Sequence, residues 1–185
     1  FIGIESPLKV THLLWINLCM DSLASLMFAG EPALKKYMRM KPRRRDESII
    51  SRPMAIQIVI MSIWLTILSL VWFKVPVFRA CFATEAQWYT GFFCMFVFAF
   101  MVNAFNVRSD GLNVFEHIGE NKRFIHIWLA IMAVQVLLVS IGGVIGEVFS
   151  CVRFGLDGWI AVCLMALTMY PVDLIRKVLT PKSKA

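Results

Sequence analysis

The sequence predicts an all-α membrane protein with a five-helix transmembrane bundle. Hydrophobic residues make up 59% of the 185 residues and charged residues only 17%, less charge than a soluble domain carries. Five apolar runs are long enough to cross a bilayer, which takes roughly 20 residues. Their apolar character is continuous and not alternating, which favours helices over barrel strands. The runs cover about residues 10–30, 53–73, 86–107, 124–146 and 158–175.

The first run contains one carboxylate, Asp21, about midway along it, and Asn17 lies four residues earlier. An ionised carboxylate at the centre of a membrane helix costs about 2.5–3.5 kcal/mol, so it usually faces a bundle interior where an ion or an opposite charge compensates it. A spacing of four residues places both side chains on one helix face. Two oxygen donors suit a hard cation such as Ca²⁺. Asn17 and Asp21 are therefore the predicted metal ligands.

A second interpretation pairs Asp21 with a basic residue. No Lys or Arg lies inside any of the five runs, so that partner would have to come from other helices. Asn17 alone would be more typical of a hydrogen bond between membrane helices than of a metal ligand. Its interest comes from Asp21 on the same face.

The other runs carry few polar groups. Asn103 and Asn106 near the end of the third run are expected at a helix terminus or in hydrogen bonds between helices, not as ligands. Asp173 near the end of the fifth run is interpreted as an ordinary interfacial charge. Five tryptophans near the ends of runs are typical of interfacial anchors, namely Trp15, Trp72, Trp88, Trp128 and Trp159.

Basic residues predict the orientation. Residues 35–52, 108–123 and 176–184 hold 15 of the 19 Lys and Arg residues, so alternate connections are basic. The positive-inside rule places these connections and the C-terminus in the cytoplasm. Topology also accounts for the net charge of +7, and no nucleic-acid partner is expected.

The beginning of the chain and its cysteines add two expectations. A chain that starts at Phe1 outside the membrane and crosses it an odd number of times is expected to be the back half of a larger protein. The five cysteines show no metal or disulfide framework by spacing. Cys81 and Cys151 both fall in predicted outer loops, which leaves a disulfide between them open.

Residues 14–26 read LWINLCMDSLASL and are followed by Glu31 and Pro32. This segment resembles the sixth membrane helix of P-type calcium pumps and is most similar to the plasma-membrane, calmodulin-regulated type. Residues 41–51, KPRRRDESIIS, are similar to the family's cytoplasmic loop after that helix, and residues 103–108, NAFNVR, to the end of its helix eight. The likeness continues in order over nearly the whole chain.

The resemblance implies that the five runs are helices six to ten, the C-terminal half of a ten-helix P-type ATPase membrane domain. Asn17 and Asp21 then match the helix-six ligands of transported calcium. Pumps of intracellular stores have a Thr where this chain has Met20 and use a helix-eight Glu near the place of Phe100. Neither residue suits a hard cation, so one calcium ion per cycle is implied. Asp21 is also expected to take up a proton when calcium leaves.

The resemblance also implies partners and a location. ATP and magnesium would bind domains absent from this sequence, so this chain alone is expected to have no ATPase activity. Its partners would be helices one to five, the cytoplasmic domains and the lipid bilayer, with calmodulin acting through a region not seen here. The plasma membrane is the expected location, with an internal calcium store or a vacuole second.

Three alternatives stay open. A related pump for another cation such as manganese typically has Gly-Pro-Pro where this chain has Ser22, Leu23 and Ala24. A non-enzymatic five-span scaffold or regulator would have no ATPase domains before Phe1. Half of a secondary transporter is disfavoured because the runs show no internal repeat.

Overall fold

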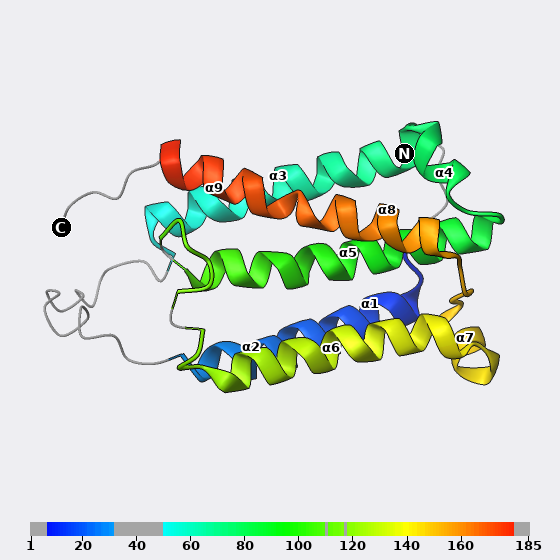
Figure 1. Ribbon diagram of the computed structural model, residues 1–185, viewed down its shortest axis with the longest axis horizontal. Coiled ribbons are helices and arrows are strands. Elements are labelled where there is room, and N and C mark those ends of the chain that lie inside the picture. Colours follow the sequence, from blue (N-terminus) through cyan, green and yellow to red (C-terminus); the bar gives the residue numbers. More distant parts are fainter. Residues whose placement is uncertain (1–6, 32–49, 110, 117, 180–185) are drawn as a thin grey trace, which may run out of the picture.

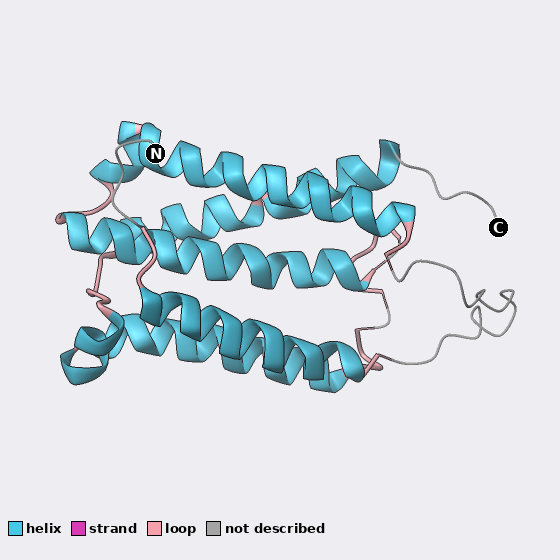
Figure 2. Cartoon of the chain, turned by 180° about the vertical axis from the view of Figure 1, so that it is seen from behind, coloured by secondary structure: helices cyan, strands magenta, loops and turns pink. Residues whose placement is uncertain are grey.

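The helices form an elongated bundle in the computed structural model, which describes residues 7–31, 50–109, 111–116 and 118–179 (Figure 1). Over these residues the regular elements are all helical, as the sequence predicts. The central helix α5, Glu85–Arg108, lies between the α1, α2 and α6 layer on one side and α3, α8 and α9 on the other, and the view from behind shows the same order (Figure 2).

Within the part of the chain that the structure describes, four helical stretches are long and apolar enough to cross a membrane. They are α3 (Arg52–Lys74), α5, α6 (Lys122–Ile141) and the pair α8 and α9 (Leu156–Leu179). The run predicted over residues 10–30 is helical but divided into α1 (Val10–Ile16), the π-helix η1 (Asn17–Leu23) and α2 (Ala24–Ala29). Its crossing of the membrane stays a prediction.

Local sequence sets where two of these helices begin. Pro53 occupies the first turn of α3, where a fixed φ and a missing N–H cost nothing. Thr84 caps α5, and its hydroxyl oxygen accepts a hydrogen bond from the Gln87 backbone at 3.2 Å. The Gln87 side chain accepts in return from the Thr84 backbone at 3.2 Å. A further short helix, α4 (Pro76–Ala80), follows α3.

The fourth predicted run is not one helix. Helix α6 ends at Ile141 because Gly142 has φ 64° and ψ −149°, a conformation open almost only to glycine. The chain continues as α7, Gly143–Phe149. The fifth run is divided too, into α8 (Leu156–Leu167) and α9 (Met169–Leu179). Pro171 explains this break, since it has no N–H and its ring crowds the Leu167 carbonyl.

Three of the tryptophans predicted as interfacial anchors take part in tertiary packing. Trp72 is fully buried, with 0% of its surface exposed, so the interfacial role predicted for it is wrong. The Trp15 indole N–H donates to the Gln135 side chain at 3.0 Å, and the Trp128 N–H donates to the Met101 carbonyl at 2.9 Å. These two hydrogen bonds join α1 to α6 and α6 to α5.

Candidate functional site

Both predicted ligands lie in the π-helix η1, which begins at Asn17 and includes Asp21. A π-helix bonds residue i to residue i+5, and such short segments occur frequently at functional sites. The sequence argument assumed ordinary helical geometry, so it did not foresee this change of winding. The side chains of Met20 and Asp21 lie outside the part of the chain that the structure describes.

Asn17 lies on a face of its helix that the other described helices leave open. Its residue is exposed, as are Leu14 (67%) and Leu18 (62%) beside it. Within the described part of the chain, no hydrogen bond occupies the Asn17 side chain. The amide is therefore accessible to groups from outside this bundle.

The opposite face of the same helix packs against α5 and α7. His12, 2% exposed, stacks on the Phe93 ring at 4.1 Å between centroids. Its Nδ1 accepts from the Lys9 backbone at 3.2 Å, so Nε2 carries the proton and donates to the Phe149 carbonyl at 2.6 Å. His12 is a hydrogen-bonded packing residue that holds this end of the helix in place.

An ion pair between the half-buried Glu31 and the buried Arg108 holds the other end. Glu31 Oε1 accepts from Arg108 Nε at 2.6 Å and from the Asn121 amide at 2.8 Å. The Arg108 side chain is 2% exposed, and its guanidinium lies 5.4 Å from the centre of the Phe124 ring. We call Glu31, Arg108 and Asn121 the Glu31 cluster. The Glu31 cluster joins the end of α2 to α5 and α6. Sequence reasoning missed it because Glu31 and Arg108 each lie just beyond the end of a predicted apolar run.

A second polar cluster surrounds Asp173. This carboxylate is 0% exposed, accepts from Arg176 Nε at 2.7 Å and lies 2.8 Å from Lys177 Nζ. Lys177 also donates to the Asn106 carbonyl at 3.2 Å, and the Asn106 amide donates to the Met169 carbonyl at 3.0 Å. The interfacial interpretation of Asp173 is wrong, because α9 packs against α3 and α5 and buries it. The predicted role of Asn106 in joining helices is confirmed.

Phe100, which the resemblance aligns near a helix-eight glutamate, lines a cavity of about 220 Å³ between α3, α5 and α9. Its ring contacts the Phe96 ring at 5.1 Å between centroids. Asn103 lines the same cavity, and its side-chain oxygen is buried without a hydrogen-bond partner. This region thus contributes aromatic packing and one amide, and no carboxylate lines it.

The four cysteine side chains that the structure describes form no disulfide. Cys81 and Cys151 are both free, so the disulfide left open by the sequence is not formed. Burial raises the pKa of the Cys151 thiol to about 11, which keeps it neutral near pH 7. Among the described side chains, no group of three or more His, Cys, Asp and Glu is placed to hold a metal ion.

Comparison with known proteins identifies the class. Residues 5–179 match the family described as "Cation transporting ATPase, C-terminus". The chain therefore belongs to this family, the C-terminal membrane region of P-type cation ATPases. This membership, together with the four apolar helices, makes it an integral membrane protein. The resemblance seen in residues 14–26 is confirmed.

Similar proteins within this family include plasma membrane calcium-transporting ATPases. The plasma membrane calcium-transporting ATPase mca-1 of Caenorhabditis elegans is 35% identical over 172 residues, which cover 87% of this chain. Plasma membrane calcium-transporting ATPase 1 is 32% identical in Gallus gallus and 33% identical in Homo sapiens, each match covering 84% of this chain. The chain spans only 13–14% of the length of these relatives. It is homologous to the C-terminal part of this enzyme class.

Proposed function

We propose that this chain is the membrane part of an ATP-driven calcium pump and that Asn17 and Asp21 supply oxygen ligands to a single transported calcium ion. Calcium is the substrate, and ATP with magnesium acts on domains outside this sequence. The observation that carries the proposal is the placement of both residues in a π-helix, with Asn17 on an open face. The names of the relatives, which are calcium-transporting ATPases, support the choice of ion.

The open face fits a site that other helices complete. Calcium takes six to eight oxygen ligands, more than two side chains can supply. Neither Phe100 nor the thioether of Met20 offers a hard oxygen, which supports one ion per cycle. The remaining oxygens would come from helices outside this chain, and these helices would cover Asn17.

The proposal includes a direction and a location. The basic connections lie on the cytoplasmic side, so calcium enters from the cytoplasm and leaves on the outer face of the plasma membrane. Calmodulin, if it regulates this pump, acts through a region outside this sequence. Asp21 takes up a proton after calcium leaves, so transport depends on external pH.

The test removes the charge of Asp21 in the full-length protein. We expect Asp21→Asn to abolish calcium-stimulated phosphorylation by ATP, while phosphorylation by inorganic phosphate persists. Persistence of the second reaction shows that the variant is folded. Ser22→Ala, an exposed neighbour in the same π-helix, is the matched control and keeps both reactions.

Two outcomes would contradict the proposal. Full calcium-stimulated phosphorylation in Asp21→Asn would remove this carboxylate from the site. Wild-type phosphorylation stimulated by manganese and not by calcium would assign the site to a related pump for another cation.

A further inference from the structure

A cavity of about 490 Å³ lies at the α4 and α7 end of the bundle, far along α5 from the Glu31 cluster. Three membrane-spanning helices contribute to it at their ends. Gln87 lies in the first turn of α5, Trp159 in the first turn of α8 and Ser140 in the last turn of α6. The cavity therefore lies where the hydrocarbon core of a bilayer meets its headgroups.

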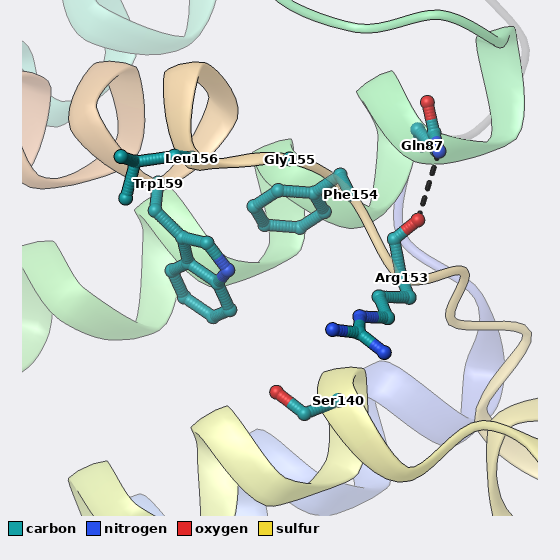
Figure 3. Close-up of a pocket in the computed structure, with 7 residues that line it drawn as sticks. All are labelled: Gln87, Ser140, Arg153, Phe154, Gly155, Leu156 and Trp159. Atoms are coloured by element: carbon teal, nitrogen blue, oxygen red, sulfur yellow. Dashed lines mark hydrogen bonds between the residues drawn. The ribbon is translucent and has the colours of Figure 1, made fainter.

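Arg153 is the cation of this cavity. Its side chain extends along the cavity toward Ser140, with the rings of Phe154 and Trp159 beside it (Figure 3). No carboxylate lines the cavity, and the guanidinium makes no hydrogen bond or ion pair with another described residue. Its planar fork of N–H donors matches the oxygens of a phosphate group.

The wall that carries Arg153 is held in place. The Gln87 amide donates to the Arg153 carbonyl at 2.8 Å (Figure 3), and the Val152 N–H donates to the Thr90 hydroxyl at 3.0 Å. The Phe154 and Trp159 rings contact each other with centroids 4.7 Å apart. The loop is thereby ordered before any ligand binds, which lowers the entropy cost of binding.

Apolar surface continues from the cavity along two helices. Leu156 lines the cavity at 75% exposure, and Ile160 follows one turn later on α8 at 49%. On α6, Leu137 lies three residues before Ser140 and is 51% exposed. Acyl chains can lie on this surface while a headgroup occupies the cavity.

We propose that this cavity binds the phosphate of a membrane phospholipid, with Arg153 and Ser140 as donors and Trp159 as the interfacial wall. By the charge-based orientation this is the outer leaflet, where phosphatidylcholine supplies the phosphate. The proposal does not depend on Asn17 or Asp21. Soluble phosphate offers the same oxygens without acyl chains, so the experiment separates these two sources.

The experiment is native mass spectrometry of the delipidated full-length protein titrated with short-chain phosphatidylcholine. We expect Arg153→Gln to weaken binding of one lipid about tenfold or more, as loss of a charged hydrogen bond predicts. Ser140→Ala, which leaves the net charge unchanged, should weaken it a few-fold. Arg79→Gln is the control at the same end of the bundle. The Arg79 guanidinium already donates a hydrogen bond to the Phe82 carbonyl at 2.8 Å and lies over the Trp88 ring.

Four results test the proposal. A diacylglycerol with the same acyl chains should not fill the site, and equal binding of this phosphate-free lipid would overturn the proposal. Equal binding by wild type and Arg153→Gln, or an equal loss in Arg79→Gln, would overturn it as well. Displacement of the lipid by millimolar inorganic phosphate, in wild type and not in Arg153→Gln, would support phosphate recognition with a soluble source.

Discussion

The two ends of the bundle are held together by different chemistry. At the end where α5 finishes, the Glu31–Arg108 ion pair joins α2 to α5, and the buried ion pairs of Asp173 lie within α9. Lys177 of that cluster joins α9 to α5 through its hydrogen bond to the Asn106 carbonyl. At the end where α5 begins, the segments are held together by packed aromatic rings. The Trp72 and Phe82 ring centroids lie 5.6 Å apart, and the Phe82 and Phe154 centroids lie 5.3 Å apart. The first end depends on charge balance and the second on volume, because buried charges need partners whereas buried rings need close packing.

The difference bears on the proposed ion site. The helix that carries Asn17 is held by the Glu31 cluster at one end and by His12 at the other, while its middle is the π-helix. A segment fixed at both ends and irregular between them can hold ligands in a defined place. The helix α5, by contrast, is uninterrupted over 24 residues and is the most buried of the four long spans.

The largest expected effect comes from breaking the charge balance at Asp173. Asp173→Asn leaves Arg176 and Lys177 buried without their anion, which should cost about 3–5 kcal/mol. Stability is measured in the full-length protein as the temperature at which buried Cys94, 0% exposed, reacts with a thiol reagent. Asp157→Asn, at an exposed carboxylate in the first turn of α8, is the control and should change stability by less than about 1 kcal/mol. Equal losses in the two variants would refute a special role for the buried pair.

A volume change should break the aromatic end. A Cβ at Gly91 would lie 2.5 Å from a Phe82 ring carbon and 3.0 Å from a Trp72 ring carbon. Both rings are buried and cannot swing away, so Gly91→Ala should destabilise by about 3 kcal/mol, near the top of the range for overpacking. The same thiol assay measures it. Gly119→Ala has no neighbour within 4 Å of its new Cβ and should be nearly neutral. Wild-type stability in Gly91→Ala would contradict this packing argument.

A smaller effect is expected at Glu31, which is 31% exposed and therefore partly solvated. Glu31→Gln keeps the side chain's shape but removes the charge that faces Arg108, and should cost about 1.5 kcal/mol. Combining it with Arg108→Gln sharpens the comparison, because the double variant should lose less than the sum of the single losses. Strict additivity, measured by the same assay, would show that the two charges do not interact.

Local sequence determines the bounds of the long helices α3 and α5 and identifies the family. Continuous apolar runs predict α3 and α5 to within one residue at each end, since hydrophobic length and helix caps are properties of neighbouring residues. The motif around Asn17 and Asp21 likewise identified the family. Their role as ligands is still a prediction.

Tertiary structure decided what local sequence could not. Glu31 meets Arg108 and Asn121 across 77 and 90 residues of sequence, and no local pattern specifies such pairs. The cations that pair with Asp173 lie three and four residues later, so the sequence alone can predict this pairing. The burial of Asp173 depends instead on how α9 packs against α3 and α5. The length and hydrophobic pattern of a helix depend on residues that are neighbours in sequence. Burial and long-range charge pairing depend on which helices lie side by side in the fold.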